Sequence, residues 1–349
     1  MEVLSQGRAA VFEEPAGPSG IRLRDRPKTE AHKPRVSLAI RRAALNHLDL
    51  WLAHGAQRVE PPRVICADGV GVVAESTSDR WKPGDEVVIY PVACCWECGP
   101  CVAGQNLFCE RFHSAGGCDI VGEDTDGTAC ELFHIDHRNL YPKPRSLSWE
   151  EAAAFPLTFL TAWRMLTTRA NLQKGETLLV VGAGAGVAAA AIQIGKHLGA
   201  RVLATSRSEG KRKRAEELGA EATFDSEGFG KPVRQATGGA GADVVFEHVG
   251  PATMGESLRA LKKGGRIVFC GSTSGTSVEL PMFRLFFGQV DFLGSTMGNS
   301  GEFEQVLNAI DEGLKPVVDS VYPLDDVQAA LEHLDGAEQF GKVVLRVSD

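Results

Sequence analysis

Residues 178–193 read LLVVGAGAGVAAAAIQ, and this stretch decides the fold. Its apolar start predicts a buried strand, and its alanine-rich end predicts a helix. Glycines at such a turn permit a tight bend and let backbone N–H groups approach a pyrophosphate, whose charge the helix N-terminus favours. The stretch therefore predicts a dinucleotide-binding turn rather than an ordinary glycine-rich one. We expect the cofactor to contact Gly182, Gly184, Ala185, Gly186 and Val187.

The sequence after this turn alternates between strand and helix patterns. RVLATS (201–206), DVVFEHV (243–249) and GRIVFCG (265–271) are typical of strands, and KRKRAEELG (211–219) is typical of a helix that ends at a glycine. Such alternation predicts a parallel sheet with helices on both faces. The predicted fold class is therefore α/β, with a doubly wound Rossmann sheet.

The first 140 residues show short strands and turns instead. KPRVSLAIRRAAL (33–45) and GDEVVIY (84–90) are two of the runs that predict strands. The pattern changes near residue 149, where Ser148 and Glu151 have the spacing of a capping box at a helix start. The tail, residues 317–349, has a strand–helix–strand pattern that fits either domain.

Length and composition bound the possible functions. A chain of 349 residues exceeds the size at which one hydrophobic core stops growing, which predicts two domains. A net charge of −8 disfavours nucleic acid and anionic membranes as main partners. The apolar runs are too short to span a bilayer, and the N-terminal stretch lacks the apolar core of a signal peptide. We therefore expect a cytoplasmic protein that acts on a small molecule.

Five of the nine cysteines lie in CCWECGPCVAGQNLFC, residues 94–109. The spacing lets a loop wrap one tetrahedral ion, and a site of four thiolates is closed to substrate. A disulfide framework is typical of short secreted chains, so the remaining alternative is a set of reduced thiols without metal. We predict one structural Zn²⁺ per chain, with Cys94 as a small buried residue outside the site. The predicted ligands are Cys95, Cys98, Cys101 and Cys109.

The residues after the second strand of the Rossmann pattern predict the cofactor. NAD(H) requires an acid there for the ribose 2′-OH, whereas this chain has Ser206 and Arg207, with Lys211 one helical turn later. A hydroxyl and an arginine suit a 2′-phosphate. Glu209 is the nearest acid but lies past the strand end. The sequence therefore favours NADP(H) over NAD(H), and the alternative for the basic residues is a solvated helix face.

With these motifs, the chain resembles the medium-chain dehydrogenase/reductase superfamily, which includes the zinc alcohol dehydrogenases and quinone oxidoreductases. The resemblance implies a GroES-like catalytic domain formed by residues 1–150 and 299–349, with the zinc knot at 95–109, and a Rossmann domain formed by residues 151–298. It runs through nearly the whole chain. The stretches that carry it are AALNHLDLWLAHG, ADGVGVVAE, DGTACE, PLTFLTAW, GADVVFEHVG, GGRIVFCGSTSG, FLGSTMG and FGKVVLRV.

The catalytic zinc of the alcohol dehydrogenases lacks its ligands in this chain. The three ligand positions that the resemblance implies fall on Asn46, on Ala67 and near Leu157, while Asp68 matches the family's acid. Cys66 and His47 are neighbours of two of these positions. They are expected to point away, because adjacent residues of a strand face opposite sides. The sequence therefore predicts hydride transfer without a catalytic metal.

Without a Lewis acid, an activated alkene is easier to reduce than a simple ketone. The resemblance to quinone oxidoreductases and enoyl reductases points the same way. Hydrogen-bond donors can stabilise the developing enolate, each contributing ~3 kcal/mol when preorganised. Asn46 is the predicted donor to the substrate oxygen or the nicotinamide ribose, and His47 and Asp49 are predicted to orient groups or relay protons. The alternatives are a helix-capping role for Asp49 and a structural role for His47.

Further residues are expected at the cofactor. The resemblance implies that Thr158 lies near the nicotinamide. Strand ends at the carboxyl edge of a parallel sheet are where ligands bind, and Lys342 could reach the cofactor from the tail. His248 is either an acid–base group or a holder of the nicotinamide ribose. The strand-end residues are Val249, Gly250, Gly271 and Ser272.

Three functions are compatible with the sequence. The first is an NADPH-dependent reductase of conjugated enones, quinones or enoyl esters. The second is a zinc alcohol dehydrogenase with a non-standard ligand set, and the third is a non-catalytic NADPH-binding protein. The substrate pocket is expected from LAHGAQRVEPP (52–62) and PMFRLFFGQ (281–289), although FRLFF (283–287) could instead form the interface of a homodimer or homotetramer.

Overall fold

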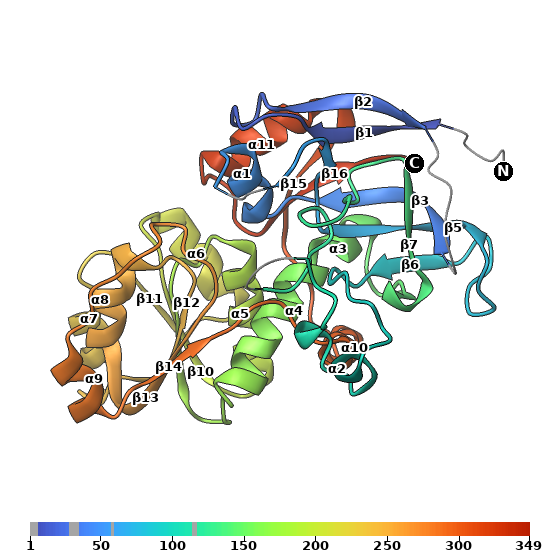
Figure 1. The fold of residues 1–349 in the computed structure, drawn as a ribbon. Coiled ribbons are helices and arrows are strands. Elements are labelled where there is room, and N and C mark those ends of the chain that lie inside the picture. The colour runs from blue at the N-terminus through green and yellow to red at the C-terminus, as the bar shows by residue number, and fades with distance from the viewer. Residues whose placement is uncertain (1–5, 28–34, 57–58, 114–116) are drawn as a thin grey trace. The chain divides into compact units, whose positions relative to one another are not determined.

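The computed structural model describes residues 6–27, 35–56, 59–113 and 117–349 (Figure 1). Of the stretches singled out above, Lys33, Pro34, Gln57 and Arg58 lie outside these described residues. The chain divides into two compact units. Unit 1 comprises Met1–Leu157 and Gly298–Asp349, and unit 2 comprises Thr158–Met297. Each unit has its own sheets, and no helix of the described residues is long and apolar enough to cross a membrane.

Unit 2 contains a six-stranded parallel sheet in the order β11-β10-β9-β12-β13-β14. This is the strand order of a doubly wound dinucleotide-binding fold. Its elements are α4 (Pro156–Arg164, which begins in unit 1), a π-helical turn (Met165–Arg169), β9 (Thr177–Val180), α5 (Gly186–His197), β10 (Arg201–Thr205), α6 (Glu209–Leu218), β11 (Ala222–Phe224), α7 (Gly230–Ala236), β12 (Ala242–Glu247), α8 (Pro251–Ala260), β13 (Leu261–Phe269), α9 (Met282–Gly288) and β14 (Asp291–Gly294).

Helices cover both faces of this sheet, which confirms the predicted α/β class. Leu179 and Leu203 pack into a buried cluster with residues of α7 and α8. The alternate residues Leu178 and Val202 face α5, since a Cβ added to Gly195 of α5 would lie within about 3 Å of both side chains. Two-sided burial explains why these strands read as continuous apolar runs.

Unit 1 is mainly antiparallel. It contains a three-stranded sheet, β2-β1-β4, and a larger sheet, β15-β16-β3-β5-β6-β8, with β7 paired to β3. Its elements are β1 (Gln6–Phe12), β2 (Ile21–Pro27), β3 (Arg35–Ala44), α1 (His47–Ala53), β4 (Arg63–Val64), β5 (Asp68–Ser76), β6 (Glu86–Ile89), α2 (Gly99–Val102), β7 (Leu132–Asp136), β8 (Leu140–Pro142), α3 (Trp149–Ala154), α10 (Ser300–Asp311), β15 (Val318–Pro323), α11 (Val327–Asp335) and β16 (Lys342–Arg346), with short 3₁₀ turns at Asn106–Phe108, His137–Asn139 and Leu324–Asp326.

The C-terminal tail completes the larger sheet of unit 1. β16 pairs antiparallel with β3 and parallel with β15, so β3 lies between the first-half strand β5 and the last strand of the chain. The sequence pattern left the tail assignable to either domain, and the strand pairing places it in unit 1.

The helix expected from residue 148 onward is split in two. Ser148 caps α3, and its hydroxyl accepts from the Glu151 N–H at 3.1 Å, which confirms the predicted capping box. The helix then ends at Ala154, and α4 begins at Pro156. Proline lacks the N–H that the helix ladder requires and disfavours helical geometry in the residue before it. By its contacts α3 belongs to unit 1, whose first segment runs to Leu157.

Candidate functional site

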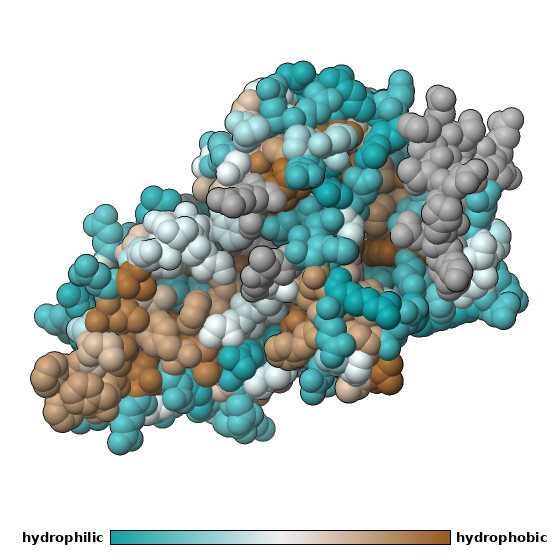
Figure 2. Space-filling model, viewed as in Figure 1, coloured by the Kyte–Doolittle hydropathy of each residue, from teal (hydrophilic) through white to brown (hydrophobic). Residues whose placement is uncertain are grey.

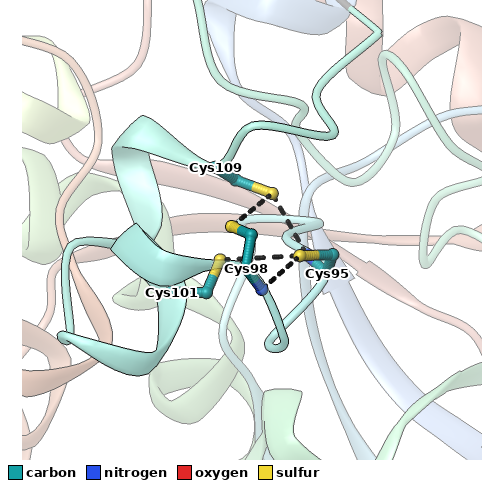
Figure 3. Close-up of side chains that lie close together, drawn as sticks. All are labelled: Cys95, Cys98, Cys101 and Cys109. Carbon is teal, nitrogen blue, oxygen red and sulfur yellow. Dashed lines mark hydrogen bonds between the residues drawn. The ribbon is translucent and has the colours of Figure 1, made fainter.

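Four thiols of unit 1 converge on one point (Figure 3). The sulfur atoms of Cys95, Cys98, Cys101 and Cys109 all lie within 4.8 Å of one another. The Cys95–Cys101 and Cys98–Cys109 sulfur atoms are 3.9 Å apart. A zinc ion at ~2.3 Å from each of four tetrahedral sulfurs requires sulfur separations of roughly 3.8 Å. The geometry therefore fits one Zn²⁺ with a closed set of four thiolates.

Backbone N–H groups point at these sulfurs, as a thiolate site requires. The Cys95 sulfur accepts from the N–H groups of Glu97 and Cys98, and the Cys109 sulfur accepts from Cys95 and Arg111. Desolvation raises the pKa of Cys95, but these N–H donors outweigh it and lower that pKa to about 6. Cys94 is buried outside the cluster, as predicted.

The zinc lobe, which is the loop of residues 95–109 that carries the four cysteines, is hydrogen-bonded to the start of α10. The side-chain oxygen of Asn106, Oδ1, accepts from the Ser300 N–H at 3.0 Å and from the Ser300 hydroxyl at 2.7 Å. In return, the Asn299 side chain accepts from the Leu107 N–H at 3.0 Å. A metal ion held by the four cysteines would therefore order a loop that caps α10, which is a scaffolding role.

A second polar cluster is buried in unit 1, around Asp68 at the start of β5. Asp68 is fully buried, and Lys342 and Asn46 are only 4% and 7% exposed. The Lys342 ammonium lies 2.8 Å from an Asp68 oxygen and 2.5 Å from the Asn46 side-chain oxygen. The Asn46 amide donates to Asp68 at 2.9 Å. The Leu157 N–H donates to the other Asp68 oxygen at 2.7 Å.

This cluster does not fit a catalytic zinc. The three positions implied by the resemblance offer an amide, a methyl and an isobutyl side chain, none of which is a thiolate or imidazole. The cation beside Asn46 is the Lys342 ammonium. The sequence did not indicate that Lys342 pairs with Asp68 inside unit 1. Lys342 was expected to reach the cofactor, and that contact stays a prediction.

The reason given for excluding Cys66 and His47 as ligands was wrong. Asn46 and His47 lie at the start of α1, after β3 has ended, so they are not neighbours on a strand. Cys66 lies between β4 and β5 with φ +72°, outside strand geometry. His47 is exposed and makes an edge-on contact with Trp51, with ring centroids 5.3 Å apart. Both roles considered for His47, orienting or relaying protons and holding the structure, stay predictions.

Asp49 holds the backbone around this cluster. Its carboxylate accepts from the Asn46 N–H at 2.7 Å and from the Cys66 N–H at 2.8 Å. Burial raises the pKa of Asp49 to about 6, against the effect of these two hydrogen bonds. The capping alternative thus describes what Asp49 does in the structure, and its role as a proton relay stays a prediction.

A further carboxylate beside this region escaped the sequence analysis. Gly122 has φ +87°, and a Cβ added there would lie within about 3 Å of the Cys66–Ala67 backbone. The next residue, Glu123, is half-buried, and desolvation raises its pKa to about 7, with the charges of Asp124 and Asp49 acting in the same direction. The sequence GEDTDG (122–127) is typical of a turn, and nothing in it indicates burial.

In unit 2 the glycine loop has the predicted strand–turn–helix form. Gly182 has φ +76°, and α5 begins at Gly186. The Gly182 N–H donates to the Thr205 hydroxyl at 3.3 Å, and the Ala183 N–H donates to the Thr205 carbonyl at 2.8 Å. A Cβ on Gly184 would lie 2.7 Å from the Lys211 side chain, which therefore lies along the loop.

His248 contacts the same loop. Its Nε2 lies 3.3 Å from the Gly182 carbonyl oxygen, and burial lowers its pKa, so the neutral ring donates from Nε2. Glu247, which the sequence analysis missed, orders this turn. Its buried carboxylate accepts from the Val249 and Gly250 N–H groups and from the hydroxyls of Thr253 and Ser257.

The end of β10 carries the residues predicted to select the cofactor. Ser206 is buried directly after β10, and Arg207 is exposed next to it. Arg212, which the sequence analysis did not single out, donates to the Ser206 carbonyl at 2.7 Å and pairs with Asp225 at 3.1 Å. Arg212 therefore fixes the turn rather than offering a free charge. Among other predicted cofactor residues, Thr158 is buried in α4, whereas Gly271 and Ser272 are exposed after β13.

Two family models match the chain. Residues 32–145 match the alcohol dehydrogenase GroES-like domain, and residues 186–312 match the zinc-binding dehydrogenase model. A solved structure titled as an NAD-dependent alcohol dehydrogenase is 41% identical with a TM-score of 0.92, covering 98% of this chain and all of that one. The structure of a 2-octenoyl-CoA carboxylase reductase, CinF, in complex with NADP and 2-octenoyl-CoA is 25% identical with a TM-score of 0.90, covering 99% and 88%.

Curated relatives include reductases of coenzyme A thioesters. The crotonyl-CoA reductase of Streptomyces avermitilis is 34% identical over 298 residues, which are 78% of this chain and 65% of that protein. This chain thus spans less than two thirds of that relative. The acryloyl-coenzyme A reductase of Metallosphaera sedula is 31% identical over 319 residues, which are 89% of this chain and 91% of that protein.

Proposed function

This chain belongs to the medium-chain dehydrogenase/reductase superfamily of oxidoreductases, and from that membership we propose that it is an NADPH-dependent reductase of α,β-unsaturated thioesters. The observation that carries the proposal is the Asn46–Asp68–Lys342 cluster, in which Asn46 stands at one of the zinc-ligand positions that the resemblance implies and is held there by hydrogen bonds with Asp68 and Lys342. Relatives that reduce crotonyl-CoA and acryloyl-CoA support the substrate class.

The cluster suits a reaction in which charge appears on a thioester oxygen. NADPH, when bound, would supply a hydride for the β-carbon of the substrate. The C=C electron pair would then move toward the thioester oxygen, and a proton relayed from solvent by His47 would join the α-carbon. We propose that Asn46 donates to that oxygen, because one of its amide hydrogens makes only a 3.5 Å contact with the Ala44 carbonyl. Lys342 and Asp68 hold the amide in place, and His47, which is exposed, is the proposed proton relay.

Steady-state kinetics test this proposal directly. We expect NADPH oxidation with crotonyl-CoA to have a kcat/KM at least ~100-fold higher than with the matching saturated ketone or aldehyde, since no metal polarises a lone carbonyl. The control is the reverse reaction, in which the reduction of NADP⁺ by simple alcohols is measured. A preference for ketones or alcohols would instead support the second candidate, an alcohol dehydrogenase, which the 41% identity to a structure of that title favours. Cofactor binding without turnover of any acceptor would support the third candidate, a non-catalytic NADPH-binding protein.

We propose NADP(H) as the cofactor, held at its 2′-phosphate by Ser206, Arg207 and Lys211. The absence of an acid at the end of β10 and the NADP complex of the CinF structure support this choice.

Replacing Arg207 with alanine is expected to raise the KM for NADPH ~10-fold and to leave the KM for NADH unchanged, because only NADPH carries the 2′-phosphate. The matched control is Lys213→Ala, an exposed cation of α6 that already pairs with Glu209 at 3.0 Å. An equal loss for both cofactors would show that Arg207 does not read the 2′-phosphate.

We further propose that the chain forms a homodimer or homotetramer through the edge of unit 2. Strand β14 is the outermost strand of its sheet, and the adjacent α9 exposes Met282, Phe283, Phe286 and Phe287 at 55–71%. Figure 2 shows this apolar surface in unit 2, where Figure 1 labels α9. Exposed apolar patches and open strand edges are typical of surfaces that associate.

A further inference from the structure

A cavity of about 580 Å³ lies in unit 2 where α7, α8 and α9 meet. Four cations line it, Lys231 and Arg234 from α7, Arg259 from α8 and Arg284 from α9, and no acidic residue lines it. None of the residues that line the cavity belongs to the glycine loop or to the end of β10. The cavity is therefore separate from the residues proposed to hold the cofactor phosphates.

The four cations differ in how they are held. Arg234 donates to the Leu261 carbonyl at 3.0 Å and to the Gly239 carbonyl, which fixes its side chain. Arg259 pairs with Glu256 on its own helix. For Lys231 and Arg284, the described part of the chain offers neither a carboxylate nor a carbonyl partner. Two uncompensated charges on a chain of net charge −8 are an expected feature of an anion site.

The size and charge of the cavity indicate the ligand. The nucleotide end of coenzyme A carries a 3′-phosphate and a diphosphate, about four negative charges in total near neutral pH. A cavity of this volume is within the range of small-molecule sites. We propose that the cavity binds the phosphorylated adenosine end of a coenzyme A thioester substrate. This inference rests on the proposed function, since it assigns the part of the substrate that does not react.

Calorimetry on the full-length protein, saturated with NADPH so that the cofactor site is filled, tests the proposal. Free coenzyme A and adenosine 3′,5′-bisphosphate are the probes. The double variant Lys231→Ala/Arg284→Ala is expected to weaken the Kd of both ~100-fold, because each charge-assisted contact is worth about tenfold. The matched control is Lys263→Ala, an exposed lysine of unit 2 outside the cavity, which should leave both Kd values unchanged.

Kinetics with a truncated substrate separate this site from the reaction site. In the double variant, the KM for crotonyl-CoA should rise ~100-fold, while kcat and the KM for crotonyl-pantetheine, which lacks the nucleotide, should stay as in the wild type. Both replaced side chains are exposed, so the thermal unfolding midpoint should not move. Equal losses for the two thioesters, or wild-type Kd values in the double variant, would overturn the proposal.

Failure of this inference is distinguishable from failure of the proposed function. If no thioester is reduced but coenzyme A still binds and the double variant weakens it, the cavity assignment stands and the reaction is wrong. If crotonyl-CoA is reduced with the same KM in both proteins, the reaction stands and the cavity assignment is wrong. Displacement of the bisphosphate by NADP⁺ in the NADPH-saturated protein would also overturn the assignment, because it would make the cavity a second cofactor site.

Discussion

One zinc ion per chain is expected in the purified protein, and Cys98→Ser is expected to lose it together with much of the stability of unit 1. Structural zinc sites contribute binding free energies on the order of 10 kcal/mol to the folded state, and three remaining thiolates cannot close the tetrahedron. Elemental analysis and thermal unfolding measure both effects. Loss of the metal should also disorder the zinc lobe and so break the hydrogen bonds that Asn106 and Leu107 make to the start of α10.

The control for this variant is Cys130→Ser, which changes another buried thiol of unit 1 that lies outside the cluster. It should keep one zinc per chain. Two zinc ions per chain, with activity abolished by a chelator while the fold persists, would contradict the assignment of the metal to the scaffold. That outcome would restore an alcohol dehydrogenase with a non-standard ligand set.

Lys342→Met is expected to lower the free energy of unfolding by ~3–5 kcal/mol, because it leaves the fully buried Asp68 carboxylate without its cation. Urea unfolding measures the loss. The double variant Lys342→Met/Asp68→Asn should recover most of it, since the uncompensated charge is then gone. The coupling energy from the four proteins reports the interaction of the pair itself.

Lys315→Met is the matched control for the buried lysine. Lys315 pairs with Glu151 at 2.9 Å, but its side chain is 65% exposed. An exposed pair contributes ~0–1 kcal/mol, so the control should be nearly neutral. A loss in Lys342→Met no larger than in this control would mean that Asp68 is not charged in the folded protein.

Local signals carried the prediction of the fold. The glycine loop, the strand and helix patterns after it, and the capping box at Ser148 each depend on residues close in sequence, and the structure confirms all three. The four cysteines that the structure brings together also lie within fifteen residues of the chain, from position 95 to 109. Signals of this kind are readable because the chemistry and the spacing are both local.

Contacts between distant residues were not readable. Lys342 lies 274 positions from Asp68, and no pattern in FGKVV indicates a buried ion pair. Strand alternation does not apply at Asn46, because Asn46 caps a helix that begins at the next residue. The four cations of the α7–α9 cavity come from three separate helices, so only the folded chain shows them together.

The pairing of β3 with both β5 and β16 has a consequence for synthesis on the ribosome. Unit 2 is one continuous segment, so it can fold as soon as Met297 has left the exit tunnel. Unit 1 begins first but has to wait for β16, the final strand of the chain, before Arg42–Ala44 at the end of β3 are paired and Asp68 meets Lys342. Domains generally fold in order of emergence, and open strand edges are prone to aggregate. In this protein the later-translated unit is the first that can be completed, and chaperone demand should concentrate on the nascent N-terminal strands.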